Sequence, residues 1–146
     1  MIKLFTIGFT GKSAEQFFDL LIGAGVKKII DTRINNVSQL AGYAKGKDLE
    51  YFAREIGHME YEHRLEYAPT KSLLKRYRDK QMTWLEYEAE YIQLLKDRDI
   101  LSRTDFKSLH NACLLCSEHM SEQCHRRILA EYLRNHNRKI KIIHLM

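Results

Sequence analysis

The sequence has 146 residues, of which 45% are apolar and 29% are charged, a balance typical of a soluble globular domain. This composition excludes a disordered tail, a collagen-like repeat and a disulfide-rich miniprotein. The length allows one sizeable hydrophobic core and leaves no room for a second ordinary domain, so we expect a single domain over residues 1–146.

The positive charge is concentrated near the end of the chain. The net charge is +5, and residues 101–146 carry eight basic and four acidic side chains. A basic end suits an anionic small molecule, a nucleotide or a nucleic acid as partner. A solvated basic helix face explains so small an excess better than a dedicated nucleic-acid surface.

The sequence also indicates a compartment. No apolar run approaches the roughly 18 residues that a membrane span needs, and residues 1–5 begin a strand pattern instead of a signal peptide. Three cysteines, an odd number, argue against a secreted disulfide framework. We therefore expect a cytoplasmic protein with reduced thiols and no membrane partner.

The first third of the chain predicts a strand, a helix and a second strand. The apolar residues 4–7 predict a strand that ends at Gly8, and Ser13 begins a helical pattern with a broad apolar face. Residues 26–30 predict a second buried strand. A strand–helix–strand unit of this kind implies a parallel sheet.

The middle of the chain is less regular. It predicts, in chain order, an irregular loop over residues 34–47, a short helix over 49–57, a short strand around 59–63, a helix over 70–79 and a longer helix after Thr83. Thr83 and Glu86 fit a capping box at the start of the longer helix. Trp84 and Tyr91 recur at helical spacing with other apolar residues, so we expect them in the core and not on a surface that stacks bases.

The end of the chain repeats the opening pattern. Residues 112–116 predict a buried strand, residues 124–135 an amphipathic helix and residues 140–145 a last strand. Together these patterns predict an α/β fold, namely a single three-layer α/β/α domain with a mostly parallel sheet of about five strands.

Polar residues are expected along one edge of this sheet, because ligands of open parallel sheets bind outside the carboxyl ends of the strands. Ten candidate residues lie at the ends of the predicted strands or begin the helix that follows the strand over residues 112–116. They are Gly8, Gly11, Lys12, Asp31, Arg33, Cys116, Glu118, Cys124, His125 and Arg126. Their convergence on one rim is the strongest functional signal in the sequence.

Gly11, Lys12 and Ser13 resemble the end of a phosphate-binding P-loop. That motif needs another Gly five residues before the Gly–Lys pair, where this chain has Thr6, so we exclude an NTPase. A smaller anion can still meet the backbone N–H groups at this helix start. Capping of the helix by Ser13 is the simpler explanation of that residue.

Three cysteines and a histidine suggest a zinc site. Cys113 and Cys116 lie three residues apart in a predicted strand, so their side chains point to opposite faces, and we expect Cys113 to be a small buried hydrophobic residue. A structural zinc site made of the three cysteines and His125 is therefore disfavoured, because strand alternation would have to fail locally, and the sequence assigns no metal ligand and no cofactor.

Cys124 is the candidate nucleophile. A thiol in the first turn of a helix is stabilised as thiolate by the helix dipole, and Arg126 or a protonated His125 adds to that effect. In the alternative, the thiol only packs, and His125 bonds to a neighbouring carbonyl. On the residues alone, packing is the simpler interpretation because buried free cysteine is common.

Asp31 and Arg33 follow the second predicted strand and lie on one face. They either form an ion pair that holds the loop, or Arg33 binds a phosphate or carboxylate through two parallel hydrogen bonds. Arg126 offers the same clamp or pairs with Glu118. Surface or structural roles are expected for the remaining histidines, which are His58, His63, His110, His119, His136 and His144.

Several groups of residues together carry a family resemblance. They are Thr6-Ile7-Gly8 with Gly11-Lys12-Ser13 and Phe17, Ile30-Asp31-Thr32-Arg33 with Ser38, Trp84 with Tyr91 and Leu95, Leu115-Cys116-Ser117-Glu118, and Cys124-His125-Arg126 with Leu129-Ala130. On these residues the chain resembles, almost from end to end, the domain-of-unknown-function 488 family of small bacterial and archaeal proteins. The most specific parts are the Cys-x-Glu strand end and the Cys-His-Arg helix start.

The chain departs from the family pattern in two places. Phe9 stands where many relatives have His or Tyr, and residues 35–39 lack the usual Pro and the Arg after Ser. If that Arg binds a ligand in relatives, anion binding here is weaker or has another specificity. The resemblance implies an α/β fold and no particular reaction. It also implies functional roles for Cys116, Glu118, Cys124, His125 and Arg126.

We expect first an enzyme that acts on a phosphorylated small molecule, a nucleotide or a nucleic-acid end. Cys124 is its candidate nucleophile, His125 its proton carrier, and Glu118 an acid, base or orienting group. Arg33 and Arg126 hold the anion.

Two alternatives stay open at this stage. One is a non-catalytic nucleotide- or nucleic-acid-binding module that uses the same rim. The other is a thiol redox or zinc-linked site at Cys116 and Cys124.

Overall fold

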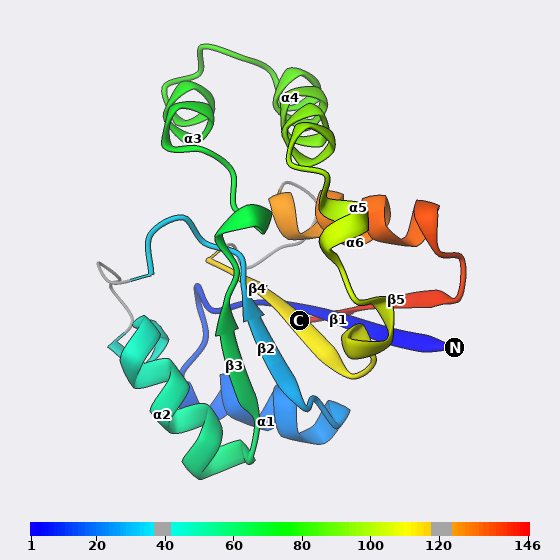
Figure 1. The fold of residues 1–146 in the computed structure, drawn as a ribbon. Helices are drawn as coiled ribbons and strands as arrows, with labels where there is room; N and C mark the ends of the chain where they lie inside the picture. The colour runs from blue at the N-terminus through cyan, green and yellow to red at the C-terminus, as the bar shows by residue number, and fades with distance from the viewer. Residues whose placement is uncertain (37–41, 118–123) are drawn as a thin grey trace.

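The structure, a computed structural model, describes residues 1–36, 42–117 and 124–146. Within these residues five strands form one sheet in the spatial order β3-β2-β4-β1-β5, and all neighbouring strands are parallel (Figure 1). The strands are β1 (Ile2–Gly8), β2 (Lys28–Asp31), β3 (Glu60–His63), β4 (Ala112–Cys116) and β5 (Ile140–Leu145). The predicted parallel sheet is confirmed.

Helices cover both faces of the sheet (Figure 1). One face is covered by α1 (Ala14–Ala24) and α2 (Gly46–Gly57). On the other side α6 (His125–His136) lies against the sheet, α4 (Trp84–Asp97) packs on α6, and α3 (Lys71–Arg78) and α5 (Ile100–Arg103) pack on α4. Short 3-10 helices are η1 (Gly42–Ala44), η2 (Leu65–Tyr67) and η3 (Phe106–Leu109). The expected α/β/α layers are therefore present. In the described part of the chain, no helix has the length and apolar character needed to cross a membrane.

Alternation along the strands divides the core into two apolar clusters. Leu4 and Leu114 pack on the face of α3 to α6, whereas Phe5, Cys113 and Leu115 pack on the face of α1 and α2. All five side chains are buried. The predicted place of Cys113 in the core is confirmed.

Capping boxes begin two of the helices. Ser13 and Gln16 form one at the start of α1, and Thr83 and Glu86 form the other at the start of α4. In each box the hydroxyl accepts a hydrogen bond from the backbone N–H three residues on, and that residue's side chain accepts one in return. Both predicted caps are confirmed.

Some element boundaries differ from the prediction. β2 begins at Lys28 instead of residue 26, because Gly25 adopts a left-handed conformation and the Val26 N–H bonds to the Leu21 carbonyl, so Val26 closes α1. α2 begins at Gly46, inside the predicted loop. Neither α5 nor the 3-10 helices were expected, since single turns are too short to show helical periodicity.

The order of the strands determines where a ligand site can form. β4 lies between β1 and β2. The chain leaves β1 and β2 toward the helices of one face, and it leaves β4 toward α6 on the other face. Connections that diverge to opposite faces open a crevice at the carboxyl end of the sheet. The carboxyl end of β4 is therefore the place to look for a site.

Candidate functional site

Two cysteines meet at the carboxyl end of β4. Cys116 is the last residue of that strand, and Cys124 is the N-cap residue of α6. Their sulfur atoms form a disulfide, which departs from the reduced thiols expected from the sequence. Their Cα atoms lie 7.6 Å apart, and both side chains are buried. Cys124 stands one position before the first turn in which we expected it, because its backbone is extended and its carbonyl accepts the N–H of Arg127.

The third cysteine lies apart from this pair. Cys113 is fully buried on the face of α1 and α2, and burial raises the pKa of its thiol well above the usual value. The strand alternation that separates it from Cys116 is confirmed. A zinc site made of three thiols is thereby ruled out for the described residues.

Arg126 brings a positive charge to the two sulfurs. Its side chain is fully buried, and Nη1 donates to Cys116 Sγ over 2.9 Å and lies 3.7 Å from Cys124 Sγ. A guanidinium at such distances stabilises a thiolate through charge-assisted hydrogen bonds. Arg126 therefore forms one site with Cys116 and Cys124, which we call the sulfur site.

His125 is held by Thr32, the residue after β2. Its Nε2 lies 3.0 Å from the Thr32 carbonyl oxygen and 2.9 Å from Thr32 Oγ1, which donates its own proton to the Leu115 carbonyl. A carbonyl can only accept, so the proton of the ring is on Nε2. Burial lowers the pKa of His125 to about 4, so the ring is neutral at neutral pH and Nδ1 carries a lone pair.

The role of His125 as a proton carrier stays a prediction, and its hydrogen bonds in this arrangement bear on it. Its single ring proton is engaged by Thr32, and a pKa near 4 keeps the imidazole from becoming protonated at neutral pH. The alternative from the sequence, in which His125 bonds to a neighbouring carbonyl, is the one observed.

Cys116, Cys124 and His125 form a cluster of atoms that metals bind. One ligand atom from each residue lies within 4.8 Å of the others, and all three residues are buried. Sulfur and imidazole nitrogen are the donors that zinc and similar ions prefer. The zinc site that the sequence disfavoured included Cys113 as a ligand. This cluster does not need Cys113.

Asp31 and Arg33 form the ion pair that was one of their two expected roles. Arg33 Nε donates to Asp31 Oδ1 over 2.8 Å, and Arg33 Nη2 donates to Asp31 Oδ2 over 2.7 Å, with both side chains buried. Nη2 also donates to the Ala44 carbonyl, and the guanidinium lies over the ring of Phe9. Asp31 thus occupies the edge of the guanidinium formed by Nε and Nη2, whereas Nη1 is buried without a hydrogen-bond partner among the described residues, so anion binding by Arg33 stays a prediction.

Two tyrosines complete the surroundings of the site, and the sequence analysis missed both. Tyr61 Oη donates to Asp31 Oδ2 over 2.6 Å, and burial together with the Asp31 charge raises the pKa of Tyr61 well above its usual value. Tyr43 Oη donates to the carbonyls of Phe9 and Lys12. The strand order places Tyr61 beside Asp31, and the position of η1 places Tyr43 beside the loop after β1. No local sequence pattern predicts either contact.

The loop after β1 is shaped by its own hydrogen bonds. Gly11 has a φ of 79°, and the Lys12 N–H bonds to the Phe9 carbonyl. Lys12 Nζ donates to the Gly8 carbonyl over 2.8 Å. Ser13 is used by the capping box, so helix capping, the simpler explanation of that residue, is confirmed.

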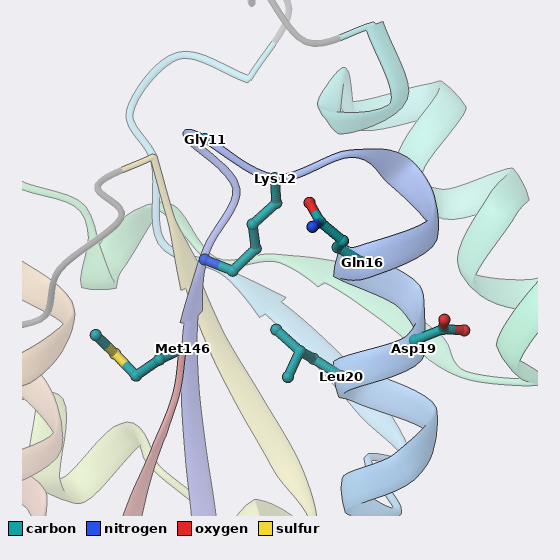
Figure 2. Close-up of a pocket in the computed structure, with 6 residues that line it drawn as sticks. All are labelled: Gly11, Lys12, Gln16, Asp19, Leu20 and Met146. Carbon is teal, nitrogen blue, oxygen red and sulfur yellow. The ribbon is translucent and has the colours of Figure 1, made fainter.

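A pocket of about 490 Å³ lies beside this loop (Figure 2). Its lining residues are Gly11, Lys12, Gln16, Asp19, Leu20 and Met146. The Lys12 side chain runs toward the end of β1 (Figure 2), and its pKa is lowered by burial and by the positive charge of Arg126. Gly8, which accepts from Lys12, is the register partner of Cys116, so the pocket and the sulfur site are neighbours.

The structure therefore brings together most of the residues that the sequence singled out. Cys116, Cys124, His125 and Arg126 share one buried site, with Gly8 and Lys12 next to it. Asp31 and Arg33 form a separate ion pair at the end of β2. Glu118 and Ser38 lie outside the described residues.

Comparison with known proteins identifies a family for most of the chain. The sequence model of the family described as Domain of unknown function DUF488 matches residues 13–133. A search of curated proteins and a search of solved structures found no match. The match includes Cys116, Cys124, His125 and Arg126, all of which lie within its limits. The chain belongs to the DUF488 family, as the Cys-x-Glu and Cys-His-Arg motifs indicated.

Proposed function

We propose that the chain is a thiol redox protein, in which Cys116 and Cys124 interconvert between a dithiol and a disulfide. One observation carries the proposal: the two sulfurs meet beside the buried guanidinium of Arg126. Packing alone does not require a charged donor beside two buried thiols. The guanidinium therefore favours a reactive role for them, and the carboxyl end of a parallel sheet is where ligands usually bind.

The proposed reaction is thiol–disulfide exchange with a low-molecular-weight disulfide such as oxidised glutathione. The Cys124 thiolate attacks one sulfur of that disulfide and releases one small thiol. Cys116 then attacks the resulting mixed disulfide and releases the second. Two protein thiols are oxidised and one small disulfide is reduced to two thiols, so electrons and protons balance.

The surroundings of Cys124 support its assignment as the attacking group. It is the N-cap of the 12-residue helix α6, and its side chain makes no capping hydrogen bond. The positive end of a helix and a nearby guanidinium both favour the thiolate over the thiol. Arg126 supplies the second of these at 3.7 Å.

A redox titration tests the proposal. The full chain is equilibrated in glutathione buffers of graded ratio, and the intact mass reports the loss of two hydrogens when the disulfide forms. We expect a reversible transition in the wild type and in Cys113→Ala, the matched control. The transition should vanish in Cys116→Ala and in Cys124→Ala. A wild-type protein that keeps three titratable thiols in excess oxidised glutathione would contradict the proposal.

The closeness of Lys12 and Arg126 favours a second candidate function. The charge of Arg126 lowers the pKa of Lys12, and Lys12 lines the pocket beside the sulfur site. Two cations at a strand end attract an anionic ligand, which is the partner class expected of an enzyme acting on a phosphorylated substrate. In this version Lys12 and Arg126 hold the phosphate, and Cys124 is the nucleophile.

Binding of inorganic phosphate and of adenosine monophosphate tests the second candidate. Lys12→Met should weaken binding about tenfold or more, because a charge-assisted hydrogen bond contributes roughly 1.5–3 kcal/mol. Lys47→Met removes an exposed lysine of α2 and should leave the affinity unchanged. Equal dissociation constants for the two variants, measured by calorimetry, would exclude Lys12 as the anion-binding group.

A further inference from the structure

The cluster of Cys116, Cys124 and His125 has the composition of a metal site. Two sulfurs and an imidazole nitrogen lie within 4.8 Å of one another, and all three side chains are buried. Three protein ligands of these types, with a fourth position left for water or a substrate, are an arrangement that zinc enzymes use. The disulfide and the metal-bound form are alternative states, because only the reduced thiols can become metal ligands.

The orientation of His125 meets a requirement of such a site. Metal-bound histidines almost always donate their other ring N–H to a carbonyl or a carboxylate, which fixes the tautomer and the plane of the ring. His125 Nε2 donates to the Thr32 carbonyl over 3.0 Å, and Thr32 Oγ1 lies 2.9 Å from the same nitrogen. Nδ1 is then the ring atom with a lone pair for a metal ion.

The backbone spacing of the two cysteines suits a bridging ion. Their Cα atoms are 7.6 Å apart, whereas most disulfides have Cα separations of about 4.4–6.8 Å. An ion held tetrahedrally at about 2.3 Å from each sulfur places the sulfurs roughly 3.8 Å apart, which fits a wider backbone spacing. The Arg126 hydrogen bond to Cys116 Sγ balances the negative charge of a metal-bound thiolate.

We propose that the reduced protein binds one zinc ion through Cys116 Sγ, Cys124 Sγ and His125 Nδ1, with the fourth coordination position open. The inference deepens the proposed redox function, since it rests on the same thiol pair. Binding of the ion releases the two thiol protons to solvent. Oxidation of the thiols by a small disulfide forms the Cys116–Cys124 bond and releases the ion.

Cobalt and zinc titrations of the reduced, metal-free full chain test the inference. Cobalt should bind with one equivalent and give a thiolate-to-metal charge-transfer band in the near ultraviolet, and zinc should displace it. Cys113→Ala should retain the full signal, whereas Cys116→Ala, Cys124→Ala and His125→Gln should lose it or weaken zinc binding by at least about 100-fold. Added azide should change the visible bands of the cobalt form, and unchanged bands would exclude the open position.

A thiol-protection experiment on the wild type avoids variants that fail to fold. Zinc should shield Cys116 and Cys124 from alkylation by N-ethylmaleimide, and a chelator should restore their reaction, as mapped by mass spectrometry. Equal alkylation with and without zinc, or no cobalt band in fully reduced protein, would overturn the inference. If the glutathione titration still shows the disulfide in that case, the proposed redox function stands without the metal.

Discussion

Arg126 Nη1 lies 2.9 Å from Cys116 Sγ, and both side chains are buried, so a positive charge is held against a sulfur where water does not reach it. A buried charge is costly unless a partner of opposite charge or a strong hydrogen bond compensates for it. A thiolate provides that compensation, and a neutral disulfide provides less of it. If the two cysteines cycle between dithiol and disulfide as proposed, this contact links the charge of Arg126 to their oxidation state.

The first prediction follows from this link. Arg126→Met should shift the equilibrium with glutathione toward the disulfide, because the reduced form loses its stabilising guanidinium. A loss of about 1.4 kcal/mol corresponds to a tenfold change, or about 30 mV for a two-electron couple. Arg127→Met is the matched control, since Arg127 lies next in α6 and pairs with Glu131. Equal glutathione equilibrium constants for the two variants would show that Arg126 does not act on the sulfurs.

The second prediction concerns the ion pair at the end of β2. Asp31 accepts hydrogen bonds from Arg33 and Tyr61, and it is fully buried. Asp31→Asn should lower the free energy of unfolding by about 3–5 kcal/mol, because it leaves the Arg33 guanidinium buried without its counter-charge. Urea unfolding measures the loss, with Glu60→Gln on the exposed side of β3 as control. A loss no larger than that of the control would mean that the pair is not structural.

Local patterns in the sequence predicted the parts of the fold that depend on neighbours along the chain. Strand alternation separated Cys113 from Cys116, and the spacing of Thr83 and Glu86 located the start of α4. The polar residues expected at the ends of β1, β2 and β4 also lie at the carboxyl ends of neighbouring strands, as the parallel sheet predicted. These features follow from the periods of strands and helices, which a single sequence displays directly.

The contacts inside the site depend on strand order, which local patterns do not encode. Thr32 reaches His125 across 93 positions in the chain only because β4 is inserted between β1 and β2. The helical spacing of α6 contains a signal for the burial of Arg126. Arg126, Ala130 and Leu133 lie at helical spacing on one buried face of α6, but a charged residue is usually assigned to the surface.

The third prediction tests how Thr32 holds His125. Thr32→Val removes the hydroxyl that donates to the Leu115 carbonyl and contacts His125 Nε2, so it should cost about 1–3 kcal/mol of stability. Thr32→Ser keeps the hydroxyl and should retain most of the stability. Long-range proton–nitrogen NMR should show His125 in the Nε2–H tautomer in the wild type. An Nδ1–H tautomer would contradict the assigned hydrogen bond to the Thr32 carbonyl.

The fourth prediction concerns the loop that borders the Lys12 pocket. Gly11 has a φ of 79°, and a Cβ added there would meet no atom within 4 Å. Gly11→Ala should therefore lower the free energy of unfolding by about 1–2 kcal/mol through backbone strain alone, without a steric clash. Gly42→Ala is the matched control, because its Cβ would also meet open space and its φ is not in the left-handed region. The control should change stability by less than about 0.5 kcal/mol in urea unfolding, and equal losses in the two variants would rule out strain at Gly11 as the cause.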